Sequence, residues 1–102
     1  MNADGLLSFL STTMKKNSAE SQMSRLRRIE QHYGNLDEIY HADLIGSIQS
    51  ELDYSKANRE ERAPNPSKIA FGADADLYEG LASIRNALRA YMRFQKHIRS
   101  HA

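Results

Sequence analysis

Hydrophobic side chains recur at alternating spacings of three and four residues over most of this chain, which is the period of an α-helix. The longest such stretch covers residues 77–98, with apolar positions at Leu77, Leu81, Ile84, Leu88, Tyr91 and Ile98. Shorter stretches predict a first helix that begins at Asn2 or Asp4, a second over about residues 18–33 and a third over about residues 42–54. No segment shows the alternation typical of a strand, so the pattern predicts an all-α fold.

Turn-forming residues separate the predicted helices. Gly34 and Asn35 follow the second helix and favour its termination there. Residues 36–40 then predict a short additional turn of helix. Gly46 lies inside the third helical pattern, where glycine costs up to ~1 kcal/mol relative to alanine. Close packing against a neighbour is the expected reason for a glycine at that position.

Residues 55–74 lose the helical period and form a predicted long loop. Pro64 and Pro66 each remove a backbone donor and restrict the preceding residue, so no helix continues through them. A connection of this length in a small domain is either functional or mobile. Ile69 and Phe71 alternate with small or polar residues, so we expect this part of the loop to lie extended against the core.

Together these elements predict a single helical domain over residues 1–102. We expect a compact bundle of four main helices, five with the short turn, in which the longest helix is the last and follows a cap at Asp74 or Asp76. The expected core consists of the apolar residues that recur on the helices: Leu6, Phe9, Leu10, Leu26, Ile29, Leu44, Ile48, Leu52, Leu81, Ile84, Leu88 and Tyr91.

Charge is unevenly distributed along the chain, although the formal net charge is only +1. Residues 34–55 contain five acids and neither Lys nor Arg, whereas residues 83–102 contain five bases and no acid. Two arrangements are open at this stage. The acidic and basic regions lie against each other and cancel, or each forms a separate charged surface.

The basic residues of the final helix recur at intervals of three and four, so they form one cationic row. Two arginines of the second helix extend this row if the second and final helices pack together. The full candidate set for binding nucleic acid is Arg85, Arg89, Arg93, Lys96, Arg25 and Arg28. Arginine suits phosphate because its planar guanidinium donates two parallel hydrogen bonds.

Three interpretations of the row remain open. In the first, the row is ordinary helix surface that is solvated or pairs with Asp43, Glu51 and Asp53 of the third helix. In the second, it contacts DNA phosphates. In the third, it contacts a protein partner. Ion pairs with those three acids would favour the protein-interaction reading, and an exposed row without them would favour DNA.

No constellation of residues predicts catalysis or a cofactor. The chain has no cysteine, which excludes disulfides and cysteine-based zinc sites. His97 and His101 share a helix face, as a metal site requires, but no acid lies near them in sequence to complete the coordination. The acids Asp37, Glu38 and Asp43 lack a spacing that specifies magnesium binding. We therefore expect no metal and no enzymatic activity.

Membrane insertion and secretion are not expected from the sequence. The longest apolar runs are two or three residues, far short of the ~20 residues that span a bilayer. The N-terminal segment lacks the basic-then-apolar pattern of a secretory signal. A cytoplasmic location is therefore the default expectation.

Two stretches of the chain together resemble a known class of module. The first is residues 24–37 leading into residues 42–46, and the second is residues 81–94. The second stretch resembles the helix that ends small N-terminal modules of bacterial restriction-type and HNH-type nucleases. There the pattern Arg-x-Ala-Leu-Arg-x-Tyr-x-x-Phe precedes the catalytic region, and the matching positions are Arg85, Ala87, Leu88, Arg89, Tyr91 and Phe94. More loosely, the chain is similar to the core-binding, SAM-like domain of tyrosine recombinases.

The resemblance implies an all-helical module that positions DNA or a neighbouring domain. It implies functional roles for Arg85 and Arg89 and core roles for the other four matching residues. Such modules are normally followed by a catalytic domain, so this chain corresponds to an excised fragment or to a stand-alone relative.

Sequence and resemblance together predict a non-catalytic module that holds double-stranded DNA through phosphate contacts, without reading bases. The alternative is a protein-interaction or regulatory module that binds no nucleic acid. Its partner would be a nuclease or another protein domain, which would dock on Ile69 and Phe71 or on the acidic region.

Overall fold

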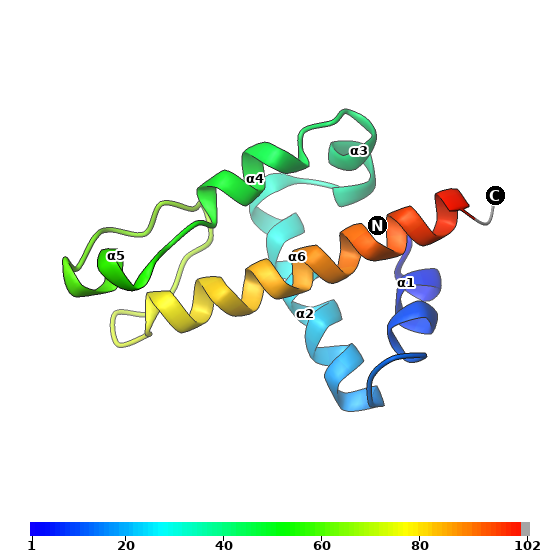
Figure 1. The fold of residues 1–102 in the computed structure, drawn as a ribbon, viewed down its shortest axis with the longest axis horizontal. Coiled ribbons are helices and arrows are strands. Elements are labelled where there is room, and N and C mark those ends of the chain that lie inside the picture. The colour runs from blue at the N-terminus through cyan, green and yellow to red at the C-terminus, as the bar shows by residue number, and fades with distance from the viewer. Residues whose placement is uncertain (101–102) are drawn as a thin grey trace.

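The longest helix, α6 (Leu77–Ser100), is the axis of the fold, and the other helices lie along or across it (Figure 1). The computed structural model of the chain describes residues 1–100. The 24 residues of α6 make it about 36 Å long. The helices before it are α1 (Ala3–Leu10), α2 (Lys16–Tyr33), α3 (Leu36–His41), α4 (Ile45–Glu51) and α5 (Lys56–Glu60). Every regular element among residues 1–100 is helical, which confirms the all-α prediction.

The helices divide into groups around α6. α2 crosses α6 and packs against it more extensively than any other helix, and α1 packs against both. α3 and α4 lie on the other side of α6 from α1, and α5 lies beside its N-terminal end (Figure 1). The molecule is elongated along α6, with extents of 45 × 31 × 22 Å. One long face of α6 is left uncovered by this arrangement.

Helix ends follow the local signals closely. Asn2, rather than Asp4, caps α1 by accepting a hydrogen bond of 3.1 Å from a backbone N–H of the first turn. Gly34 ends α2 with a φ of 105°, a conformation that L side chains rarely adopt. Asp76, rather than Asp74, caps α6 by accepting from two backbone N–H groups of its first turn at 3.0 and 3.4 Å.

The third predicted helix is shorter than expected and begins later. Residues 42–44 form a turn in which Asp43 has a φ of 60°, and α4 starts only at Ile45. Leu44, expected in the core, is therefore 53% exposed, because the turn directs it away from the buried side of α4. The expectation of close packing at Gly46 is also wrong, since a Cβ there would meet no atom within 4 Å.

The predicted long loop at residues 55–74 is partly helical. Its first turns form α5, which begins with a reciprocal capping box between Ser55 and Asn58. The sequence pattern missed α5 because none of its residues is buried. The rest of the segment is extended, and Ile69 is 1% exposed in the core, which confirms the expected contact. Phe71 lies so near Gly80 that a Cβ there would come within 2.6 Å of its ring.

The core is larger than the sequence predicted. Ten of the twelve expected residues are buried; the exceptions are Leu44, described above, and Phe9, which is only partly buried. Ile98 also differs from the apolar pattern and is 41% exposed. The buried residues outside that list are Ala19, Met23, Leu36, Ile45, Tyr54, Ile69, Ala87, Ala90 and Phe94. Of these, Ile69 was expected against the core, and the resemblance implied core roles for Ala87 and Phe94. Most of them come from turns, from the extended segment, or from small residues that periodicity ranks low.

A polar network on the buried side fixes how α6 is rotated about its axis. The Tyr91 hydroxyl donates to Asp37 Oδ1 at 2.5 Å, and Gln95 Nε2 donates to both, at 2.7 Å and 3.1 Å. Burial raises the pKa of Tyr91 above its ordinary value, and the hydrogen bond to Asp37 and the charge of that carboxylate add to the increase. Because α3 holds Tyr91 inward, the cationic side of α6 points outward.

Candidate nucleic-acid interface

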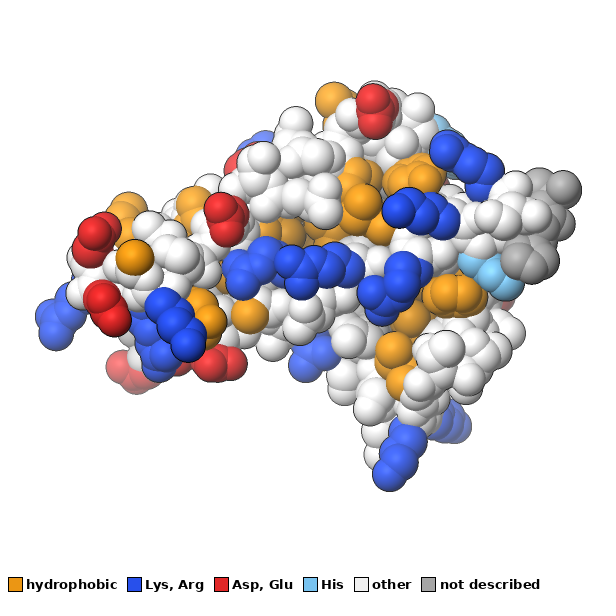
Figure 2. Space-filling view, in the orientation of Figure 1, with side chains coloured by type: hydrophobic (Ala, Val, Ile, Leu, Met, Phe, Trp, Pro, Cys, Tyr) orange, Lys and Arg blue, Asp and Glu red, His pale blue; other side chains and the backbone are white. Residues whose placement is uncertain are grey.

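The cationic row lies on the uncovered face of α6, where Figure 2 shows a band of blue side chains along the helix. Arg89, Arg93 and Lys96 are exposed, whereas Arg85 is half-buried. Residues four apart on a helix are displaced by about 40° around the axis and 6 Å along it. The row therefore follows the helix closely, and the spacing argument from the sequence holds in three dimensions.

Arg85 connects the row to α4. Its Nη1 donates to the carbonyl oxygen of Leu52 at 2.7 Å. Leu52 caps the C-terminus of α4, where unsatisfied carbonyls carry partial negative charge and attract a cation. Arg85 is thus engaged within the fold, and the exposed cations of the row begin at Arg89.

The acids of the third predicted helix do not pair with the row. Within residues 1–100, Asp43, Glu51 and Asp53 form no ion pair with an arginine of α6. Glu51 instead accepts a hydrogen bond of 3.2 Å from the Tyr33 hydroxyl. The acidic and basic regions therefore lie beside each other without direct cancellation.

The cations differ in how they are engaged. Within the described part of the chain, the Arg89 side chain donates only to Asn86 Oδ1 on its own helix, at 3.2 Å. Among the residues that the structure describes, neither the Arg93 nor the Lys96 side chain has a hydrogen-bond or ion-pair partner. Further along the helix, Arg99 lies over the ring of Tyr40 at 5.9 Å. The exposed end of the row is thus a concentration of positive charge that the fold does not use.

A shallow groove separates the row from α4. One hollow of about 360 Å³ is lined by Gln49, Ser50, Asp53, Arg85, Leu88 and Arg89. A second hollow of about 470 Å³ is lined by Tyr40, His41, Asp43, Ile45, Gly46, Gln49, Met92 and Arg99. Gln49 lines both, so the two hollows adjoin beside α6. The groove gives a bound chain room beside the cations.

The two candidate arginines of α2 behave differently from the row. α2 and α6 do pack together, which was the stated condition for Arg25 and Arg28 to extend it. Arg28, however, donates to the backbone oxygen of Ala70 and lies over the Phe71 ring at 4.6 Å. Its guanidinium holds the extended segment against the core. Arg25 is half-buried on the preceding turn of α2.

Three aromatic rings that the sequence analysis did not bring together lie near the exposed end of the row. The Phe9 ring of α1 is 5.6 Å from Phe94 and 5.0 Å from His97, both on α6. They line a hollow of about 350 Å³ with Gly5, Ser8 and Thr12. Periodicity places Phe9 on an apolar helix face but carries no signal for a partner almost a whole chain length away.

One of the two docking surfaces expected for the alternative function, the loop residues Ile69 and Phe71, is used within the fold. Ile69 is 1% exposed, and Phe71 is half-buried with the Arg28 guanidinium over its ring. Ile69 therefore packs in the domain's own core and is not part of a docking surface, whereas docking on the acidic region stays a prediction.

Metal-binding residues do not gather in the part of the chain that the structure describes. No three His, Cys, Asp or Glu side chains within residues 1–100 are close enough to hold an ion. His101, the possible partner of His97, lies outside the described residues. No helix in the described range combines the length and the apolar character needed to cross a membrane.

Comparison of the chain with protein-family models, with curated proteins and with solved structures finds no match.

Proposed function

We propose that this domain is a non-catalytic helical module that holds DNA through its phosphates. The proposal rests on one observation: Arg89, Arg93 and Lys96 stand exposed on one face of α6, and no acid within residues 1–100 forms an ion pair with them. Surface arginines usually find a carboxylate nearby when the fold supplies one, and here Asp53 lies across the groove without pairing. Surplus cations in a row are the feature that a polyanion recognises.

The row favours the DNA backbone over the bases. From Arg89 to Lys96 it extends about 10 Å along the helix, so several phosphates of one strand lie within reach. Phosphate contacts of this kind fix position without reading sequence. The resemblance of residues 81–94 to nuclease modules agrees with such a role, in which this domain supplies attachment and a partner domain supplies chemistry.

Fluorescence anisotropy of a labelled duplex, titrated with the domain at two salt concentrations, tests the proposal. With three or four phosphate contacts, affinity is expected to fall about 40- to 150-fold between roughly 50 and 200 mM salt. The triple variant R89Q/R93Q/K96Q is expected to bind weakly and to lose most of this salt dependence.

A matched control removes the same charge elsewhere. K16Q/K56Q/R62Q also neutralises three exposed cations, on α2, on α5 and after α5, but all three lie off the row. It is expected to bind as the parent does. Equal loss in both triple variants would indicate a general charge effect, and an absence of binding at low salt would refute the proposal.

One observation favours a second candidate function, a protein-interaction module. Leu44 is 53% exposed beside a hollow of about 190 Å³ lined by Tyr33, Ile39, Leu44, Ser47, Ile48, Glu51 and Lys68. With the half-buried Tyr33 and Ile39 it forms a contiguous apolar rim to this hollow, which is the kind of surface that a protein partner covers. If this surface docks a protein, L44D is expected to abolish binding of that partner. The affinity for DNA is expected to stay unchanged, so this variant distinguishes the two functions.

A further inference from the structure

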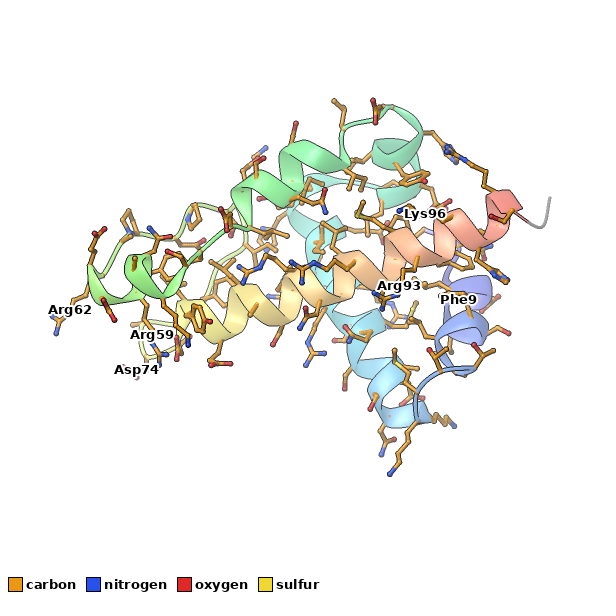
Figure 3. The ribbon with its side chains drawn as sticks, in the orientation of Figure 1. Phe9, Arg59, Arg62, Asp74, Arg93 and Lys96 are labelled. Atoms are coloured by element: carbon orange, nitrogen blue, oxygen red, sulfur yellow. The ribbon has the colours of Figure 1, made fainter. Side chains whose placement is uncertain are left out.

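The exposed end of the cationic row meets an aromatic surface made by two helices. Figure 3 labels Arg93 and Lys96 of α6 and Phe9 of α1 at the same end of the molecule, with Arg93 nearer to Phe9. Phe9 lies against Phe94 and His97, and Arg93 directly precedes Phe94 in sequence. In Figure 2 the band of blue side chains continues into orange and pale blue groups at this end. Phosphate-binding and ring-stacking groups are therefore neighbours.

The Phe9 ring is placed to receive another flat ring. Its planes with Phe94 and His97 are inclined at 48° and 44°, so neither neighbour lies flat on it as a stacked partner would. The ring is half-buried and lines the hollow of about 350 Å³ together with Ser8 and Thr12. These two side chains add hydroxyl groups at the edge of the hollow.

We infer that the DNA held by this domain is single-stranded at this point, with an unpaired base stacked on Phe9 while Arg93 and Lys96 contact the adjoining phosphates. Proteins that bind single strands combine a cationic track for the backbone with aromatic rings for the bases. A base in a duplex is paired and stacked on its neighbours, so its face cannot reach this surface. This inference rests on the proposed function and adds the class of DNA.

The test compares a single strand with its duplex by anisotropy, using the parent domain and Phe9 variants. The parent is expected to bind the single strand more tightly. Phe9→Leu keeps an apolar side chain against Phe94 but removes the ring, so single-strand affinity is expected to fall at least about fivefold while duplex affinity stays unchanged. Phe9→Tyr keeps the ring and is expected to bind as the parent does.

Two further measurements show whether an effect of Phe9→Leu comes from lost stacking and not from the loss of any aromatic ring or of the fold. Tyr78→Leu removes another half-buried aromatic ring at the opposite end of α6 and is expected to leave single-strand affinity unchanged. A fluorescent purine analogue in the strand, whose emission is quenched by stacking, reports the contact in the parent domain. That reading remains decisive if Phe9→Leu fails to fold in a thermal melt.

The outcomes separate the two proposals. If strand and duplex bind equally, Phe9→Leu has no effect and the row variant still weakens both, stacking is refuted and phosphate holding stands. If neither form binds, both proposals fall. An RNA strand of the same sequence is expected to bind no more tightly than DNA, and tighter binding would overturn the assignment to DNA.

Discussion

The two ends of α6 use their positive charges differently. At the N-terminal end, Arg59 of α5 forms an ion pair of 2.7 Å with Asp76 and lies over the Tyr78 ring at 5.5 Å. Nearby, Arg28 lies over Phe71. At the other end, the side chains of Arg93 and Lys96 have no hydrogen-bond or ion-pair partner within residues 1–100. Figure 3 labels Arg59 and Arg62 at one end of the molecule and Arg93 and Lys96 at the other.

The arginines at the first end therefore stabilise the fold, whereas the cations at the second end are available to bind a ligand. Arg28 and Arg59 attach the segment between α5 and α6, which contains two prolines and little regular structure. The side chains of Arg93 and Lys96 hold no other part of residues 1–100 in place, and their helix is already fixed by the core beneath it. Substitutions at the first end should therefore change stability, whereas those at the second should change only binding.

The largest expected effect removes the scaffold common to both ends. Leu88 is 1% exposed near the middle of α6. L88A is expected to lower the free energy of unfolding by about 2–5 kcal/mol, through lost burial and a residual cavity. Urea denaturation followed by circular dichroism measures this, with R93A as the control that should unfold as the parent does. A midpoint for L88A equal to the parent's would contradict the central placement of this residue.

The next effect concerns the network that orients the row. Tyr91 has a raised pKa in the folded state, so above its ordinary value of about 10 the unfolded chain releases this proton first. The contribution of the protonated Tyr91 hydroxyl to the free energy of unfolding is therefore fully present below pH 10. Above pH 10 it declines by about 1.4 kcal/mol per pH unit. At pH 9, Y91F is expected to be about 1.5–3 kcal/mol less stable than the parent.

The gap between Y91F and the parent should close as pH rises above 10, because only the parent loses this contribution. Denaturant titrations at several alkaline pH values measure both curves, and other groups that titrate there cancel in the difference. Parallel curves for the two proteins would show that Tyr91 does not hold its proton more tightly in the folded state.

Periodicity predicted those parts of the fold in which side chains contact near neighbours in sequence. α2 and α6 were found because Leu26, Ile29, Ile84 and Leu88 repeat the helical period and are buried. α4 was placed too early because Leu44 fits the period but precedes the helix in a turn. Periodicity cannot distinguish an apolar residue before a helix from one inside it.

The candidate site was predicted as a row but not as a surface. The interval of four residues was sufficient to predict that Arg89 and Arg93 lie next to each other on one face of the helix. The engagement of Arg85 by Leu52, 33 residues away, and of Arg28 by Ala70, 42 residues away, depends on tertiary contacts that leave no mark in spacing. The contact of Phe9 with Phe94 was hidden for the same reason.

A smaller effect tests the comparison between the two ends directly. R28M keeps the apolar stem of the side chain but removes the guanidinium that donates to Ala70 and covers Phe71. We expect a loss of about 1–2 kcal/mol in the free energy of unfolding, from one charged hydrogen bond and one partly exposed cation–π contact. R93M is the matched control and should change stability by less than about 0.5 kcal/mol. Equal effects of the two substitutions would remove the distinction between the ends.

The smallest expected effect is the ion pair that joins α5 to the start of α6. The side chains of Arg59 and Asp76 are 53% and 36% exposed, so water screens much of their attraction. A double-mutant cycle of R59M and D76N is expected to give a coupling energy of about 0.2–1 kcal/mol that declines with added salt. Asparagine retains the capping oxygen at position 76, so the cycle isolates the ion pair from the helix cap. A coupling energy of zero at low salt would mean that Arg59 contributes only through its contact with Tyr78, and that Arg28 alone attaches this end of the molecule by its charge.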